Sequence, residues 1–180
     1  MTSLFRRTIS GFTVIEMVVV IAIIGITSSI VITSLMAGRA VRLTEQAVHD
    51  VASALRQAQN FALTGRANTG EESCYFGLRF NSSSQYVLVQ YYRSSGNCNS
   101  YHTLTTTNLS GGVTFTGIGS YPTTLAFSLP RAEVYSATSG AFSGLATAQL
   151  IGLTKSSRTQ YLCLYPGGRI EERGTTGTCP

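Results

Sequence analysis

Residues 11–25 read GFTVIEMVVVIAIIG, and this apolar run determines how the rest of the chain is interpreted. The run continues beyond Gly25, so that the 22 residues from Met17 to Gly38 carry no charge, while Arg6 and Arg7 precede it. A helix of that length spans roughly 33 Å, enough for the hydrocarbon core of a bilayer. We therefore expect a membrane-spanning helix whose basic N-terminal end stays on the cytoplasmic side.

Glu16 is an unusual residue in this context, because it lies just inside the apolar segment. A carboxylate in lipid costs several kcal/mol unless it is neutralised or paired. Glu16 is therefore either a functional contact or a residue near enough to the interface to reach water.

The segment Gly11–Glu16, preceded by a basic leader, resembles the processing signal of type IV prepilins and type II secretion pseudopilins. The resemblance implies that a prepilin peptidase removes residues 1–11 by cutting between Gly11 and Phe12. It also implies that Phe12 is then N-methylated and that Glu16 becomes the fifth residue of the mature chain. In that family this glutamate meets the N-terminal amine of a neighbouring subunit during assembly, so that the two charges cancel in lipid.

The helix changes character at Arg39, where the membrane-spanning half (residues 12–38) gives way to an amphipathic half (residues 39–65). Apolar residues recur at spacings of three, four or seven, which predicts one buried stripe. The stripe comprises Val41, Val48, Val51, Ala52, Leu55, Ala58 and Ala62. We expect this half to leave the membrane and to pack its stripe against a sheet, with Gly65 as its stop.

Residues 66–180 alternate in polarity rather than following a helical period, which predicts strands. The predicted strands are residues 76–80, 86–89, 103–109, 113–118, 125–129, 148–153, 161–165 and 169–173. The Gly- and Ser-rich stretch Ser136–Gly144 is expected to be a loop. A long helix followed by an antiparallel, β-rich globular domain is an α+β architecture, and the resemblance implies the pilin fold.

The four cysteines are Cys74, Cys98, Cys163 and Cys179, and none forms a CxxC pair. An even number in an exported domain predicts two disulfides and an oxidising compartment. Sequential pairing is favoured among the three connectivities, and four buried free thiols are the alternative. The chain has only two histidines, so that no metal site is expected.

The sequence predicts neither a catalytic site nor a cofactor. It contains no HExxH, GxSxG or Walker-type motif. The carboxylates of Glu71–Glu72 and Glu171–Glu172 are adjacent in sequence, and neighbouring residues of a strand point to opposite faces. We therefore expect a structural protein rather than an enzyme.

The late segment Leu164–Arg169 and the helix segment Leu55–Ala58 resemble the minor-pilin and pseudopilin subfamily of the FimT and GspH type. Some members of that subfamily are linked to DNA uptake through a basic C-terminal end containing Gly-Arg. A DNA-binding subunit for natural transformation is therefore the alternative function. Its possible contacts are Lys155, Arg158, Arg169 and Arg173. Because Glu171 and Glu172 cancel much of the local field, an edge strand with alternating charges is favoured instead.

The resemblance as a whole implies a minor pilin or pseudopilin, a structural subunit of a type IV pilus or a type II secretion filament. Its partners would be the prepilin peptidase, other pilins and the assembly platform of the bacterial inner membrane. The subunit would stay in that membrane before assembly and enter a periplasmic or cell-surface filament afterwards. The net charge is +5, or +3 without the leader, and this mild excess does not indicate a nucleic-acid binder.

Overall fold

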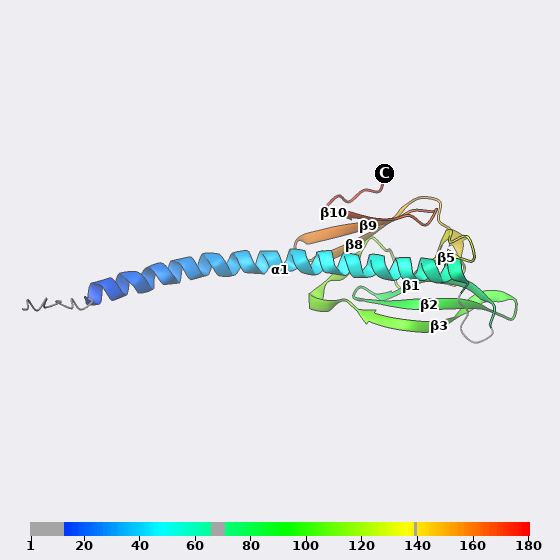
Figure 1. Cartoon of the computed structure of the whole chain (residues 1–180), viewed down its shortest axis with the longest axis horizontal. Helices are drawn as coiled ribbons and strands as arrows, with labels where there is room; N and C mark the ends of the chain where they lie inside the picture. The colour runs from blue at the N-terminus through cyan, green and yellow to red at the C-terminus, as the bar shows by residue number, and fades with distance from the viewer. Residues whose placement is uncertain (1–12, 66–70, 139) are drawn as a thin grey trace, which may run out of the picture. The chain divides into compact units, whose positions relative to one another are not determined.

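The computed structural model describes residues 13–65, 71–138 and 140–180, except for the side chains of residues 30–37. The predicted leader, the cleavage site between Gly11 and Phe12 and the methylated Phe12 lie outside the described residues. One long helix comes first in the chain and strands follow it (Figure 1). The α+β layout predicted from the sequence is therefore confirmed.

Helix α1 runs from Val14 to Thr64, within one or two residues of the predicted ends. The chain divides into two compact units, Met1–Arg39 and Ala40–Pro180, so that α1 contributes to both. In the described part of the chain, no helix combines the length and the apolarity needed to cross a membrane. The predicted membrane-spanning segment includes residues 30–37, whose side chains lie outside the described part.

The strands of the second unit form two sheets, and every described pairing is antiparallel. Sheet A has the order β3–β2–β1–β5–β6–β7, and sheet B has the order β10–β9–β8–β4. The strands of sheet A are β1 (Ser73–Ser82), β2 (Gln85–Ser94), β3 (Asn97–Asn108), β5 (Thr123–Ser128), β6 (Val134–Ala137) and β7 (Ser143–Gly144). Those of sheet B are β4 (Thr114–Thr116), β8 (Gln149–Lys155), β9 (Arg158–Leu164) and β10 (Ile170–Gly174).

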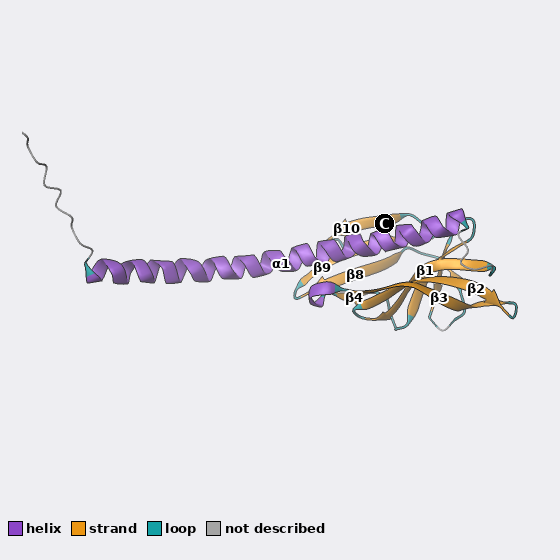
Figure 2. Ribbon diagram, turned by 60° about the horizontal axis from the view of Figure 1, so that its bottom comes forward, coloured by secondary structure: helices purple, strands orange, loops and turns teal. Residues whose placement is uncertain are grey.

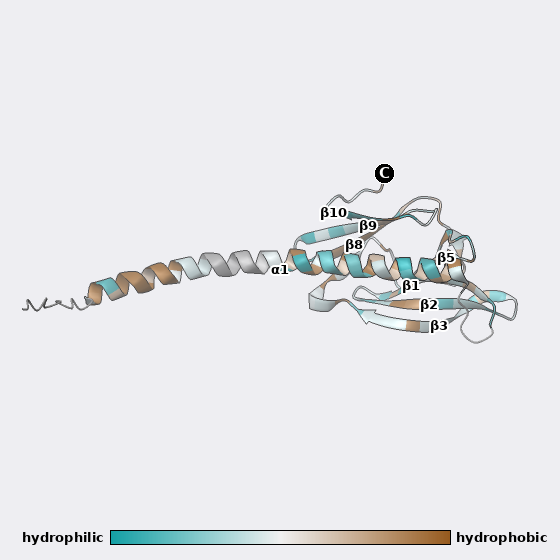
Figure 3. Cartoon of the chain, in the orientation of Figure 1, coloured by the Kyte–Doolittle hydropathy of each residue, from teal (hydrophilic) through white to brown (hydrophobic). Residues whose placement is uncertain are grey.

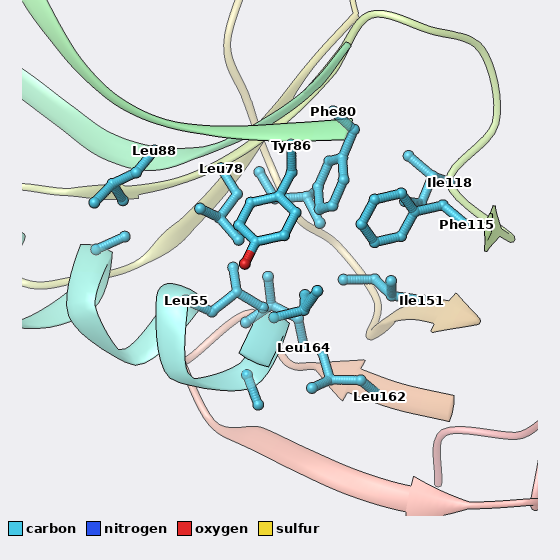
Figure 4. Close-up of a cluster of buried hydrophobic side chains, with 14 of the residues drawn as sticks. Leu55, Leu78, Phe80, Tyr86, Leu88, Phe115, Ile118, Ile151, Leu162 and Leu164 are labelled. Carbon is cyan, nitrogen blue, oxygen red and sulfur yellow. The ribbon is translucent and has the colours of Figure 1, made fainter. Parts of the chain in front are cut away.

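The core of the second unit lies where the two sheets and the second half of α1 meet. In Figure 1 this half of α1 runs between β1–β3 on one side and β8–β10 on the other, and Figure 2 shows β8, β9 and β1–β3 together on one side of the helix. The helical stripe predicted from the sequence is buried from Val48 to Ala62, and Val41 is half-buried. Figure 4 shows Leu55 beneath Leu78 of sheet A and beside Leu164 of sheet B. This core lies wholly within the second unit.

Two strands were not predicted, and the predicted loop Ser136–Gly144 is wrong at both ends. Its first two residues belong to β6, and its last two form β7. These strands form because β6 pairs with β5 and β7 pairs with β6, not because of a local pattern. The third strand is also longer than predicted, since β3 begins at Asn97 and its first half is polar.

The two disulfides are Cys74–Cys98 and Cys163–Cys179, the sequential pairs that the sequence favoured. The first joins the start of β1 to the start of β3, and the second ties the C-terminal segment to β9. Gly77 of β1 has a packing role, because a Cβ there would lie 2.3 Å from the Leu125 carbonyl oxygen of β5. Only glycine therefore fits at this point between the two strands.

Candidate functional site

The start of α1 is closed by a reciprocal pair of capping bonds between Thr13 and Glu16. The Thr13 backbone N–H and its hydroxyl both donate to Oε2 of Glu16, at 2.8 and 2.9 Å. The Glu16 backbone N–H donates to the Thr13 hydroxyl at 3.4 Å. Because Thr13 precedes the first helical residue and Glu16 is the third, the pair is a capping box. Each residue thus satisfies a donor that the helix start would otherwise leave unpaired.

Glu16 stands in a surface that is otherwise apolar. Large apolar side chains between Val14 and Ile26 are 48 to 82% exposed, and they are brown in Figure 3. They are Val14, Ile15, Met17, Val18, Val19, Val20, Ile21, Ile23, Ile24 and Ile26. Such a continuous apolar surface indicates contact with lipid or with other apolar protein surfaces.

The Glu16 carboxylate keeps one oxygen for a further partner. Both capping bonds end on Oε2, and within the described residues Oε1 accepts no hydrogen bond. A carboxylate bound in this way is well oriented, and its second oxygen can still accept a bond from a cationic amine. The first turn of α1 therefore presents one fixed negative charge in an apolar surface.

Of the basic residues predicted for DNA binding, Lys155, Arg158 and Arg173 lie on strands of sheet B and Arg169 precedes β10. Lys155 and Arg158 pair with each other across the β8–β9 turn. Arg169 precedes β10, whose Ile170 pairs with Leu164 at the far end of β9. Leu164 is six positions beyond Arg158 along β9, which at 3.3 Å per residue is roughly 20 Å. Arg169 therefore lies apart from Lys155 and Arg158, whereas Arg173 lies between these places, beside Tyr161 and Leu162 of β9.

Arg169 and Arg173 also have carboxylate partners. The Arg173 guanidinium donates to Glu171 at 2.6 Å, and an Arg169 nitrogen lies 3.5 Å from the other carboxylate oxygen. Arg169 also lies over the Tyr165 ring, 3.9 Å from its centroid, and the Tyr165 hydroxyl donates to Glu171 at 3.2 Å. The Arg173 hydrogen bond, followed by that of Tyr165, lowers the pKa of Glu171 below its ordinary value of 4.5. The single charge of Glu171 thus compensates one of the two arginine charges that phosphate contact would need.

Glu172 points to the opposite side of β10 and contacts α1 instead. It pairs with Arg56 at 3.1 Å and lies 3.6 Å from His49. The two adjacent carboxylates therefore serve different partners on opposite faces, as expected for a strand. In the described part of the chain, no group of three or more His, Cys, Asp or Glu residues is arranged to hold a metal ion.

Thr13 is the site residue that the sequence analysis missed. The signal was available, because Thr13-Val14-Ile15-Glu16 fits the S/T-x-x-E pattern of a capping box ahead of an apolar run. The α1 partner of Glu172 could not have been found in this way. Arg56 and Glu172 are 116 residues apart, and only the packing of β10 beside α1 brings them together.

Comparison with known proteins adds one finding to this geometry. A family model described as the prokaryotic N-terminal methylation motif matches residues 6–37. No curated protein and no solved structure matches the chain. The matched residues include the capping box and the exposed apolar surface that follows it. The N-terminal segment of this chain therefore matches a prokaryotic N-terminal methylation motif, consistent with a type IV pilin-like prepilin signal.

Proposed function

We propose that the chain is a filament subunit, a minor pilin or pseudopilin of a type IV pilus or a type II secretion filament. The observation that carries the proposal is the methylation motif at residues 6–37, followed by a separate β-rich unit. A prepilin peptidase cuts between Gly11 and Phe12 and methylates Phe12. The apolar half of α1 anchors the subunit in the inner membrane and then packs in the filament, while the unit Ala40–Pro180 faces outward.

Glu16 is the assembly contact in this proposal. Its Oε2 is held by Thr13, and its Oε1 is available to the methylated amine of a neighbouring subunit. Methylation of an amine keeps its positive charge, so that the two opposite charges cancel in an apolar surrounding. The exposed apolar side chains on both sides of Glu16 supply the contact area that this single ion pair cannot.

Processing can be tested by the intact mass of the protein from cells with and without the prepilin peptidase. We expect a chain that begins at Phe12 and carries one additional methyl group, and only in cells with the enzyme. A chain that keeps residues 1–11 in both strains would contradict the proposal at its first step.

Assembly can be tested by shearing surface filaments from cells and blotting the sheared fraction for this protein. We expect the unaltered protein in that fraction, and a loss of at least tenfold in Glu16→Ala with processing intact. Glu45→Ala is the matched control, because Glu45 is an exposed carboxylate further along α1, outside the matched motif. A processed protein that stays in the membrane fraction of piliated cells would favour the secretion pseudopilin over the pilin. Equal recovery of Glu16→Ala would remove the assembly role of Glu16.

A further inference from the structure

The edges of the two sheets are protected unequally, and β3 is the exception. β7 has two residues and β4 has three, while β10 carries Glu171, Glu172 and Arg173 among its five. Shortness and charge are the usual means of preventing an edge strand from pairing with another chain. β3 has 12 residues, NCNSYHTLTTTN, and contains no proline and no Lys, Arg, Asp or Glu. Figure 1 shows it along the outer border of sheet A.

The backbone groups at the end of β3 face away from the sheet. The Leu109 N–H donates to the Ser84 carbonyl at 2.8 Å, one residue beyond the paired residues Gln85 and Asn108. In an antiparallel ladder, hydrogen-bonded and non-hydrogen-bonded residue pairs alternate, so that Gln85 and Asn108 form a non-hydrogen-bonded pair. The backbone N–H and C=O of Asn108 therefore point away from β2. Thr106 lies two residues earlier, so that its backbone N–H and C=O also point away from β2. Both residues are exposed, so that an added strand can reach these groups.

A groove between α1 and β2–β3 runs beside this edge. Two adjoining hollows of about 170 and 260 Å³ make up the groove, and both are lined by Gln57, Leu88 and Thr105. The first also contains Phe61 and Leu104, which are partly buried apolar residues. A strand added to β3 would place every second side chain toward this groove. The edge offers backbone bonds and the groove offers room for side chains, which are the two elements of strand addition.

Asp50 indicates which strand fits. It lines the second hollow, and within the described residues it makes no ion pair. A strand that carries Lys or Arg would supply the missing charge. β3 itself has neither residue, so that the β3 of a second copy supplies no cation to Asp50. The other edges of a second copy are too short or too charged to pair along β3.

We propose that the β3 edge and the groove beside α1 bind an extended strand of a different polypeptide. That strand has uncharged, β-branched or apolar side chains at alternate positions and one Lys or Arg placed to meet Asp50. This docking goes beyond the filament role and does not depend on Glu16 or on processing.

The test is a titration of the full chain in detergent micelles with a synthetic, end-blocked eight-residue peptide of alternating Val and Thr with one central Lys. Amide chemical shifts are the readout. We expect saturable changes at Thr106, Asn108 and the amides around Asp50. A peptide of the same sequence with methyl groups on alternate backbone nitrogens should bind at least tenfold more weakly, since it cannot complete the ladder.

Two variants locate the site. Thr106→Pro removes an outward N–H while leaving the bonds to β2, and it should weaken binding at least tenfold, whereas Thr106→Val should not. Asp50→Asn should weaken binding of the Lys peptide about fivefold and leave a peptide with central Gln unchanged. If Thr106→Pro does not fold, the comparison of the two peptides on the unaltered chain decides.

Two outcomes would overturn the proposal. One is the absence of shift changes at millimolar peptide, or equal binding of the methylated peptide, in folded protein. The other is a dimer of the full chain in micelles that Thr106→Pro returns to monomer, because the occupant of the edge would then be a second copy.

Discussion

Gln59 and Gly168 are joined by a hydrogen bond across 109 residues of sequence: the Gln59 amide donates to the Gly168 carbonyl at 3.0 Å. Gly168 has φ +83°, and a Cβ there would lie 2.7 Å from the Gln59 amide nitrogen and 2.9 Å from the Ala132 carbonyl oxygen. Gly168 therefore determines how the turn before β10 packs against α1.

Replacing Gly168 with alanine should destabilise the protein, because the new side chain meets backbone and requires a left-handed conformation. We expect a loss of about 1–3 kcal/mol in the free energy of unfolding, measured by urea denaturation of the full chain in micelles. Gly167→Ala is the matched control, since a Cβ at Gly167 would have no atom within 4 Å. Equal stability of the two variants would show that the turn relaxes around the methyl group.

Replacing Thr13 with valine should loosen the first turn of α1. The variant keeps the shape of the side chain but loses the hydroxyl that donates to Glu16 and accepts from its N–H. Loss of an N-cap costs about 0.5–2 kcal/mol, so that the amides of Glu16 and Met17, which donate to Thr13, should exchange at least twofold faster with deuterium. Thr13→Ser should behave like the unaltered chain, and exchange of the amides around Leu55 should not change in either variant.

Replacing Glu171 with glutamine should release Arg169 and Arg173 from their carboxylate partner. If DNA contact at this strand is limited by that pairing, a weak and salt-sensitive affinity for duplex DNA should appear or rise severalfold. Glu133→Gln changes the net charge equally, but its partner is Arg131, outside sheet B. The DNA affinity of both variants can be compared by an electrophoretic mobility assay at two salt concentrations. An equal rise in affinity in both variants would reflect net charge alone.

The lowered pKa of Glu171 also predicts a dependence of stability on pH. A carboxyl whose pKa is lower in the folded state contributes stability that is complete above its unfolded value, here 4.5. That contribution is lost as the pH falls below 4.5 and through the folded pKa. Urea midpoints measured from pH 6 to pH 3 should therefore fall less steeply in Glu171→Gln than in the unaltered chain. Parallel curves would mean that Glu171 titrates alike in both states.

The two disulfides should contribute comparably to stability. They close loops with sequence separations of 24 and 16, and each loop corresponds to about 3 kcal/mol in the chain-entropy view. We expect Cys74→Ala/Cys98→Ala and Cys163→Ala/Cys179→Ala each to lower the unfolding midpoint by several degrees. Addition of dithiothreitol to the unaltered chain should lower it by more than either double variant. A double variant as stable as the parent would show that its bond adds only strain.

Long local patterns in the sequence were sufficient to predict most of the fold. The helical stripe around Leu55 and the alternation of Phe76, Leu78 and Phe80 each extend over several residues of one element, and all of them are buried as expected. β6 and β7 were missed because they are four and two residues long and have no pattern of their own. Pairing with a neighbouring strand creates them, and such pairing cannot be seen locally.

The residues of the candidate site were likewise predictable only where the pattern is local. Glu16 was evident because a carboxylate in an apolar run is costly, and its partner Thr13 lies only three residues away. The sequence also indicated that Glu171 and Glu172 would weaken the nearby positive charge. It could not assign Arg56 to Glu172, because that depends on which face of β10 meets α1.

The Cys163–Cys179 bond turns the end of the chain into a covalent ring that contains β10. The ring joins both sides of β10 covalently to β9, because Cys163 lies in β9. β10 also cannot peel away from β9 as a free end. A single endoproteolytic cut within the ring leaves both pieces attached, so that under non-reducing conditions a nicked subunit would still migrate as one chain.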